Sequence, residues 1–331
     1  MRNIGPDEPT YVIAEAGINH NGELETAREL IHAAAEASAD AVKFQLWTAD
    51  RFHTDPEQVT RLEELTFDDD EWRELKAVAD AADITFFGSA FDEERVDFLV
   101  DELDAPLIKV ASGDLTHTPL LEHVAGKNRP VILSTGMATL GEVERAVEAL
   151  EPNEEPLYLL ECVSSYPVDV SDLNLSVMQT LARNFDCSVG FSDHTTGTVG
   201  PTAAVALGAT VIEKHFTLDT EMNGPDHELS LDPASFEGMV EQIRAIESGV
   251  GDGRKRPQEP EIEAAGSMRR GLKTTRPIER GAQLTPDSVK VSRPTTGIEP
   301  HNYDRVVGKT VREPLAENEP ITWDCLLGAD Q

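Results

Sequence analysis

The sequence predicts an α/β protein, a (β/α)₈ TIM barrel followed by a small β-rich domain. Short apolar runs rich in β-branched residues alternate with Ala-, Glu- and Leu-rich segments of helical periodicity. Eight such strand–helix units in about 250 residues match the size and rhythm of a TIM barrel. The alternative, an open doubly wound sheet, is disfavoured because no G-x-G-x-x-G motif follows any of the runs. We expect strands at residues 11–17, 41–46, 84–91, 107–113, 131–136, 157–164, 189–194 and 211–217.

The segments between the strands and after them set the domain boundaries. Stretches such as 24–37 (LETARELIHAAAEA) and 140–150 (LGEVERAVEAL) carry apolar residues at helical spacing. A last barrel helix is expected at 234–247, and the Gly- and Pro-rich stretch 249–257 after it is typical of a linker. Beyond it, prolines and turns separate short strand-like pieces. We therefore predict a barrel at 1–250, a linker at 251–267 and a small domain at 268–331.

Charge and hydropathy bear on the partners of the chain. A net charge of −34 disfavours nucleic acid and anionic membrane surfaces as partners. No apolar run approaches the roughly 18–20 residues that span a bilayer, and residues 1–11 lack the order of a secretory signal. We expect a soluble cytoplasmic protein. Nine lysines against 19 arginines, with Asp and Glu spread along the chain, indicate a halophilic protein, because dense counterions screen self-repulsion.

Lysines inside expected barrel strands are the first sign of a functional site. Lys43 and Lys109 lie where burial of an uncompensated charge is costly. Either one alone is also compatible with a misplaced strand boundary or a snorkelling surface residue. Together, at the strand ends where TIM barrels place their active sites, they predict a cradle for phosphate or carboxylate. The polar residues at the same strand ends are Gln45, Ser89, Ser112, Asp114, Ser134, Ser164, Tyr166 and Ser192.

Two histidines end neighbouring strands. His194 closes the seventh expected strand and His215 the eighth, so both imidazoles should reach one side of the barrel mouth. Such a pair suits a divalent ion such as Mn²⁺, or less specifically Zn²⁺ or Mg²⁺. Asp193 and Asp226 are candidates to assist in binding the ion. The alternative is a pair of hydrogen-bonded core histidines. Two protein ligands would leave positions open for substrate oxygens.

Glu15 is a carboxylate inside the apolar run YVIAEAG, so it must be paired or functional. One interpretation is a buried ion pair with Lys43 or Lys109. The other is an acid/base group beside a substrate carbonyl, with a pKa set by its surroundings.

Nine stretches of the chain carry a resemblance to a known family. The N-acetylneuraminate (sialic acid) synthase family, with the legionaminic and pseudaminic acid synthases and spore-coat polysaccharide relatives, has signature stretches similar to eight of them. The ninth, at residues 269–300, resembles the antifreeze-like (SAF) domain of that family. The eight barrel stretches are AEAGINHNG, VKFQ, IKVASGD, ILSTGM, SSYP, GFSDHTTG, EKHFT and GPDHELSLDP.

The resemblance implies an enzyme that joins phosphoenolpyruvate to the open-chain aldehyde of an N-acetylhexosamine, adds water and releases phosphate. The acceptor would be N-acetylmannosamine or a related acetamido sugar. His194 and His215 would hold a Mn²⁺-like ion, and Glu15 would transfer a proton. Arg293 would reach the barrel of a partner subunit in a domain-swapped homodimer. Phosphoenolpyruvate would contact Lys43, Ser89, Lys109, Ser112, Ser134 and Ser192, and the sugar Asp114, Tyr166, Glu213 and Asp226; Gln45 and Ser164 complete the substrate-binding set.

Three departures from the family pattern leave the identity of the sugar open. Asp114 stands where some members have Glu, Ser89 replaces a Thr, and Ser164 replaces an Asn of some bacterial members. A legionaminic or pseudaminic acid synthase, acting on a 6-deoxy diacetamido sugar, is therefore an alternative. Two others are a barrel aldolase or lyase that acts on a keto acid through a Schiff-base lysine, and a non-catalytic sugar-binding or scaffold protein.

Overall fold

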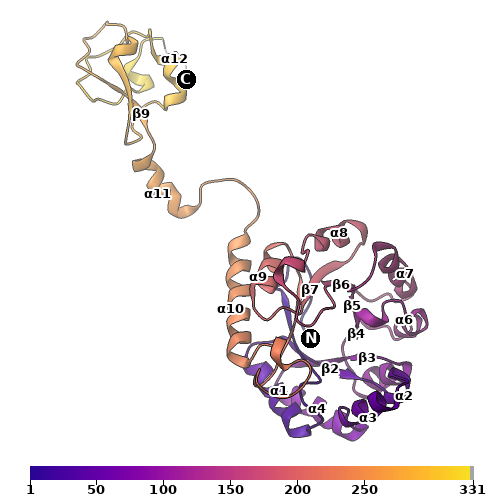
Figure 1. Cartoon of the computed structure of the whole chain (residues 1–331). Helices are drawn as coiled ribbons and strands as arrows, with labels where there is room; N and C mark the ends of the chain where they lie inside the picture. The colour runs from indigo at the N-terminus through magenta and orange to yellow at the C-terminus, as the bar shows by residue number, and fades with distance from the viewer. Residues whose placement is uncertain (329–331) are drawn as a thin grey trace. The chain divides into compact units, whose positions relative to one another are not determined.

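A computed structural model describes residues 1–328; residues 329–331, the end of the predicted domain 268–331, lie outside it. The chain divides into two compact units, with the boundary between Gly251 and Asp252 in the sequence. The first unit is a closed barrel of eight parallel strands in sequential order (Figure 1). The predicted TIM-barrel fold is therefore confirmed. The strands are β1 (Tyr11–Gly17), β2 (Ala41–Leu46), β3 (Thr85–Ala90), β4 (Ile108–Val110), β5 (Val131–Ser134), β6 (Leu157–Cys162), β7 (Ser188–Asp193) and β8 (Val211–His215).

Helices surround the barrel (Figure 1). Most bury apolar side chains against the strands, as Trp72 and Leu75 do in α4, and several begin with a polar cap. Asp68, for instance, accepts from the backbone nitrogens of Asp70 and Glu71 at the start of α4. The helices of this unit are α1 (Leu24–Glu36), α2 (Ala49–Phe52), α3 (Pro56–Glu64), α4 (Asp69–Ala81), α5 (Glu93–Asp97), α6 (Thr118–Ala125), α7 (Leu140–Leu150), α8 (Val177–Asn184), α9 (Val199–Ala206) and α10 (Pro233–Val250).

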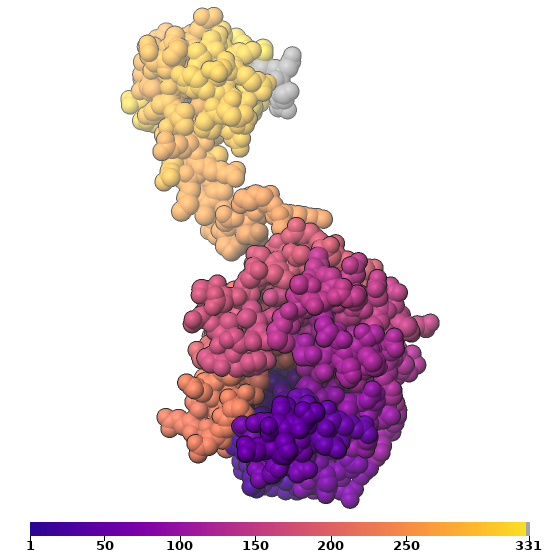
Figure 2. All heavy atoms as spheres, turned by 45° about the vertical axis from the view of Figure 1, so that its right-hand side comes forward, coloured from indigo at the N-terminus to yellow at the C-terminus, as the bar shows by residue number. Residues whose placement is uncertain are grey.

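Alternation along the strands decides which side chains face the inside of the barrel. At the carboxyl end of β8, Glu213 and His215 line the interior cavity, whereas Lys214 between them is fully buried on the other face. Close packing is tight enough to require glycine at one point of β7. A Cβ atom on Gly190 would lie 2.4 Å from the carbonyl oxygen of Val211 on β8. In the space-filling view the surface of the barrel unit is hollowed between indigo N-terminal segments and later orange and pink ones (Figure 2).

The second unit contains the predicted small β-rich domain. It has the antiparallel pair β9 (Gly271–Thr274) and β10 (Val289–Ser292), the short helix α12 (Tyr303–Val306) and several isolated bridges. Leu272, Val306 and Ile321 are among the residues of its own apolar core. Within the predicted linker 251–267 the structure has the helix α11 (Glu259–Met268), which begins with a capping box between Gln258 and Glu261. Among residues 1–328, no helix combines the length and apolar character needed to cross a membrane.

Candidate active site

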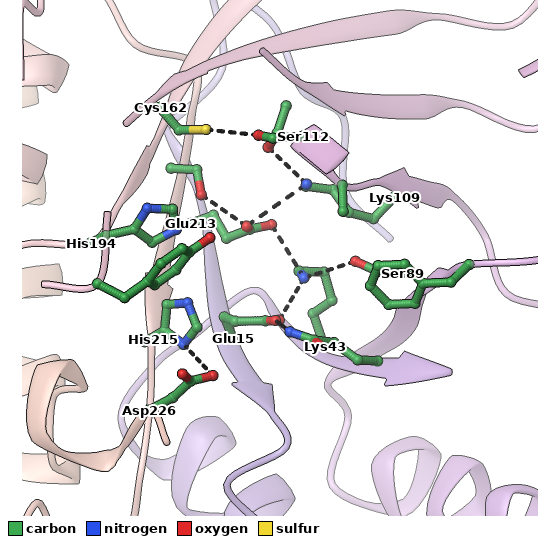
Figure 3. A pocket seen from close by; sticks show the side chains of 16 residues that line it. Glu15, Lys43, Ser89, Lys109, Ser112, Cys162, His194, Glu213, His215 and Asp226 are labelled. Atoms are coloured by element: carbon green, nitrogen blue, oxygen red, sulfur yellow. Dashed lines mark hydrogen bonds and ion pairs between the residues drawn. The ribbon is translucent and has the colours of Figure 1, made fainter. Parts of the chain in front are cut away.

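A cavity opens at the carboxyl ends of the barrel strands and gathers most of the predicted site residues (Figure 3). Its volume of about 230 Å³ lies a little below the roughly 300–1,000 Å³ of sites for drug-sized ligands, so it suits a small ligand. Thirteen of the sixteen predicted residues line it: Glu15, Lys43, Gln45, Ser89, Lys109, Ser112, Ser134, Tyr166, Ser192, His194, Glu213, His215 and Asp226.

Glu15 and Lys43 form a buried ion pair across β1 and β2, where the two residues are in register. Lys43 Nζ lies 2.6 Å from Glu15 Oε2, and Gln45 Nε2 donates to Glu15 Oε1 at 2.9 Å. Burial raises the pKa of Glu15, and Lys43 only partly opposes this. Burial alone would lower the pKa of Lys43, but Glu15 and Glu213 together raise it. The site therefore contains a firmly cationic lysine beside a carboxylate whose pKa lies above that of an exposed glutamate.

Lys109 lies on the other side of Glu213. Its ammonium group donates to Ser134 Oγ at 2.7 Å and to the carbonyl oxygen of Val110 at 3.1 Å. Glu213 lies 3.7 Å from Lys43 and 3.9 Å from Lys109, and it accepts a hydrogen bond from Ser192 Oγ at 3.0 Å. Burial would raise the pKa of Glu213, yet the two lysines lower it below its usual value.

The contacts of the lysines show how an anion would bind. Neither Lys43 nor Lys109 is closer than 3.7 Å to Glu213, so this carboxylate balances both charges without a direct hydrogen bond to either. Each ammonium group also contacts a serine hydroxyl, Ser89 for Lys43 at 3.1 Å and Ser134 for Lys109. Two cations with adjacent hydroxyls make a strong site for a phosphate or carboxylate group.

His194 and His215 lie side by side, with ring centroids 5.4 Å apart (Figure 3). The ring of Tyr166 is tilted against that of His194, with centroids 4.1 Å apart. The Nδ1 atom of His194 donates to the carbonyl oxygen of Val163 at 2.7 Å, which leaves its Nε2 lone pair available. Burial lowers the pKa of both histidines, that of His215 well below its usual value. Both imidazoles are therefore neutral at physiological pH, the state that binds metal ions.

These residues fit a divalent cation in one specific way. The Nδ1 atom of His215 is buried and has no hydrogen-bond partner among residues 1–328, and Asp226 Oδ2 lies 3.7 Å away. Within the same residues, no group of three or more His, Cys, Asp or Glu side chains is arranged to hold a metal ion. The donor set thus suits an ion that takes two imidazole nitrogens and completes its coordination with water or substrate oxygens.

Comparison with known proteins shows the family. Residues 30–255 match the NeuB family, and residues 269–327 match the SAF domain. The chain belongs to the NeuB family. The resemblance stated from the sequence is confirmed, and this NeuB chain is an enzyme of the N-acetylneuraminate synthase-like kind.

Three relatives show how far the similarity extends. An N,N'-diacetyllegionaminic acid synthase from Legionella pneumophila is 38% identical over 340 residues, which cover 97% of this chain and 95% of that protein. The human N-acetylneuraminate-9-phosphate synthase is 34% identical over 97% of this chain and 93% of its own length. The crystal structure of an N-acetylneuraminic acid synthetase from Leptospira borgpetersenii, in complex with citrate, has a TM-score of 0.76. It is 38% identical and covers 79% of this chain and 92% of that one.

Three predicted residues of the NeuB chain do not line the cavity. Asp114 lies on the short 3-10 turn Ser112–Asp114, 3.9 Å from His117, because the chain turns away after β4 instead of continuing as a strand. The Oγ atom of Ser164 is buried and has no hydrogen-bond partner among the described residues. Arg293 belongs to the C-terminal unit, where its carbonyl oxygen accepts from Lys273 Nζ at 3.0 Å. The roles of Asp114, Ser164 and Arg293 remain predictions.

Two cavity residues with functional side chains were not predicted, Cys162 and Phe91. Cys162 ends β6, and its Sγ atom lies 3.0 Å from Ser112 Oγ. Phe91 follows β3 and contacts the ring of Phe52 edge-to-face, with centroids 4.7 Å apart. Their position at strand ends could have indicated that Cys162 and Phe91 line the site. They were not predicted because apolar residues at such positions are usually part of the core.

Proposed function

We propose that this enzyme condenses phosphoenolpyruvate with the open-chain form of an N-acetylhexosamine, N-acetylmannosamine or a related acetamido sugar, to give a nonulosonic acid and phosphate. The methylene carbon of phosphoenolpyruvate would bond to the aldehyde carbon, water would add to the former enol carbon, and phosphate would leave. One observation carries the proposal: a single cavity places two buried lysines with serine hydroxyls opposite two neutral histidines.

The lysine side of the cavity suits phosphoenolpyruvate. Lys43 and Lys109 would exchange their shared neighbour Glu213 for the phosphate and carboxylate oxygens of the substrate, and Ser89 and Ser134 would donate hydroxyl hydrogen bonds. Because these side chains are nearly inaccessible to solvent, the charge-assisted bonds would be stronger than on a surface. Preformed ammonium groups would hold the phosphate in place until it leaves.

The histidine side suits the aldehyde. His194 and His215 would hold a divalent ion, Mn²⁺ in preference to Mg²⁺ because imidazole ligands suit the softer ion. When bound, such an ion would polarise the aldehyde and make its carbon more electrophilic. Tyr166 and Asp226, which line the cavity next to these histidines, would contact the acetamido sugar and orient its aldehyde end.

Glu15 is the group that we propose for proton transfer. Its carboxyl group lies between Lys43 and the end of β8, since Glu15 pairs in register with His215 across β1 and β8. Burial raises the pKa of Glu15, so its carboxyl group takes up a proton more readily than an exposed glutamate does. It would give that proton to the aldehyde oxygen as the carbon–carbon bond forms.

An assay of phosphate release tests which sugar the enzyme accepts. A second candidate, a 6-deoxy diacetamido sugar, is favoured by the 38% identity to a legionaminic acid synthase. We expect phosphate release from phosphoenolpyruvate that requires an acetamido sugar and stops when a chelator removes divalent ions. N-acetylmannosamine, its 6-phosphate and 6-deoxy diacetamido sugars form the acceptor panel. Phosphate release in none of these mixtures, with metal supplied, would refute the proposal.

A Schiff-base aldolase would give a different result. Such an enzyme needs a neutral lysine, and Lys43 is held as a cation by Glu15 at 2.6 Å. Treatment with pyruvate and borohydride should leave the mass of the protein unchanged. A stable adduct on Lys109, whose pKa burial lowers, would favour the aldolase instead.

We also propose that two chains form a domain-swapped homodimer in which Arg293 completes the partner subunit's site. The proposal is supported by the SAF domain match over residues 269–327. Light scattering should give the mass of a dimer. Mixing Arg293→Ala chains with chains that carry Lys109→Ala should restore activity above that of either variant alone, because one cavity of the mixed dimer then has both side chains.

A further inference from the structure

The loops that follow β1 and β8 are joined by a buried hydrogen-bond cluster outside the cavity. It consists of Asn21 in the β1 loop and Thr217 and His227 in the β8 loop, which we call the latch. Thr217 and His227 have no exposed surface. None of the three lines the cavity, and the mechanism above does not use them. Asp226, the residue next to His227, does line it.

Both ring nitrogens of His227 have hydrogen-bond partners within the latch. The hydroxyl of Thr217 donates to the carbonyl oxygen of Asp219 at 3.2 Å, so its oxygen accepts from His227 Nδ1 at 2.7 Å. With the proton on Nδ1, the Nε2 atom is an acceptor, and Asn21 Nδ2 lies 3.1 Å from it. Both ring nitrogens are therefore satisfied, one by each loop, and the ring cannot rotate without losing both bonds.

Backbone packing encloses the ring further. A Cβ atom on Gly224 would lie 2.5 Å from His227 Cδ2 and 2.8 Å from Asn21 Oδ1, so the loop backbone presses directly on the latch. Asn21 itself adopts a left-handed backbone conformation, with φ of 52°, which brings its amide toward the β8 loop. The β8 loop thus has little freedom on either side of Asp226.

A second set of bonds holds Asp226 from the other direction. Ser230 Oγ donates to the carbonyl oxygen of Asp226 at 2.6 Å and accepts from Asn19 Nδ2 at 2.9 Å. Asn19 Nδ2 also donates to the carbonyl oxygen of Phe216 at 2.9 Å. Asp226 is therefore flanked by two buried connections, both of which end in the β1 loop.

We infer that His227 is a positioning residue, which with Asn21 and Thr217 fixes Asp226 over the cavity beside His215. The inference rests on the proposed function, in which Asp226 contacts the acceptor sugar. The side chain of Asp226 lies 3.7 Å from His215 Nδ1, so a shift of the loop would displace it from both the sugar and the histidine pair (Figure 3). Lys43 and Lys109, on the opposite side of the cavity, have no contact with the latch.

Thr217→Val tests the inference, because valine keeps the shape of threonine and removes the hydroxyl that accepts from His227 and donates to the carbonyl oxygen of Asp219. We expect KM for the acceptor sugar to rise about tenfold, while KM for phosphoenolpyruvate changes less than about twofold. Thr217→Ser keeps the hydroxyl and should restore KM for the sugar to within about threefold of wild type. The matched control is Thr210→Val, which removes a buried hydroxyl that donates to Val189 at the opposite end of β8 and should leave both KM values unchanged.

A double-mutant cycle separates positioning from general loosening of the barrel. In an Asp226→Asn background, Thr217→Val should lower kcat/KM for the sugar by less than about twofold, because the latch acts through Asp226. Gly224→Ala forces a methyl group onto the His227 ring, so it should likewise raise KM for the sugar and leave KM for phosphoenolpyruvate nearly unchanged. Gly238→Ala, with open space around the added methyl group, should change neither KM. Equal losses for both substrates, or a full effect of Thr217→Val in the Asp226→Asn background, would overturn the inference. A wild-type enzyme that uses no acetamido sugar would instead overturn the proposed function on which it rests.

Discussion

The ion pair between Lys214 and Asp193 supports the strand ends that carry both histidines. Neither side chain has any exposed surface, and Lys214 Nζ lies 2.6 Å from Asp193 Oδ2. Thr195 Oγ1 donates to the same carboxylate at 2.9 Å, and Lys214 also donates to the carbonyl oxygen of Thr195. His194 lies between Asp193 and Thr195 in the chain, and His215 follows Lys214. The pair therefore joins the two neighbouring histidine positions from behind.

Lys214→Met should remove this support at a large cost in stability. Methionine fills much of the same space, but it leaves the Asp193 carboxylate buried without its cation. Loss of one partner of a buried pair costs about 3–5 kcal/mol. The surface pair of Lys76 and Asp80, at 2.7 Å and one helical turn apart, provides the control. Lys76→Met should cost about 0.3–0.5 kcal/mol.

Urea denaturation at one fixed salt concentration, followed by circular dichroism, measures both variants. We also expect the double variant Asp193→Leu, Lys214→Met to recover most of the lost stability, because apolar side chains of similar size can replace a buried ion pair. If Lys214→Met costs no more than Lys76→Met, the pair does not have the buried, unscreened character that the structure assigns to it, and the reasoning is refuted.

Three further predictions concern pH, the cavity wall and salt. Burial raises the pKa of Glu161 to about 7, so in the folded state it keeps a proton that the unfolded chain releases near pH 4.3. The contribution of Glu161 to folding stability therefore falls as pH rises from about 4 to about 7. Above pH 7 Glu161→Gln should have a free energy of unfolding higher than wild type by roughly 4 kcal/mol, measured by urea denaturation, and the difference should close toward pH 4. Equal stability of the two proteins at pH 8 would contradict this. Gly136→Ala would place its methyl group 2.3 Å from Ser164 Oγ and 2.8 Å from Cys162 Sγ and Ser112 Oγ. These side chains would have to move, so KM for phosphoenolpyruvate should rise about tenfold or more. An unchanged KM would contradict this prediction. Given the net charge of −34, the melting temperature should rise with KCl up to molar concentrations, and a maximum in dilute buffer would refute the halophilic interpretation.

The barrel was predictable because its signal is repeated. Eight apolar runs with helical segments between them specify strand number and order even where single boundaries are wrong. The expected strand 107–113 shows such an error: β4 ends at Val110, and the polar Ser112–Asp114 forms a 3-10 turn. Helix α11 was not expected, since its flanking glycines and prolines dominate the local composition.

The part of the candidate site that follows from strand topology was predictable. Residues at the carboxyl ends of parallel strands lie at one rim of the barrel. The sequence alone therefore places Lys43, Lys109, His194 and His215 together. Which partner each side chain takes depends on register and rotamer, which a single sequence does not specify. The choice of Lys43 over Lys109 as partner of Glu15 is one such detail.

The latch could not be predicted for a different reason. Asn21 and Thr217 lie in irregular loops and His227 begins the short 3-10 helix His227–Leu229, so no periodicity relates their sequence separation to distance. Their pairing follows from backbone conformations such as the left-handed turn at Asn21, and these become visible only in three dimensions.

The most direct test of the account is product analysis by mass spectrometry. Enzyme, phosphoenolpyruvate, a divalent metal and each acetamido sugar in turn should yield, for at least one sugar, a single new compound heavier than the acceptor by one pyruvate unit. His215→Ala should yield none, because the cavity then lacks one of its two imidazoles. If wild-type enzyme consumes phosphoenolpyruvate without forming that compound, or if His215→Ala forms it at the wild-type rate, the two sides of the cavity do not meet in one carbon–carbon bond-forming reaction.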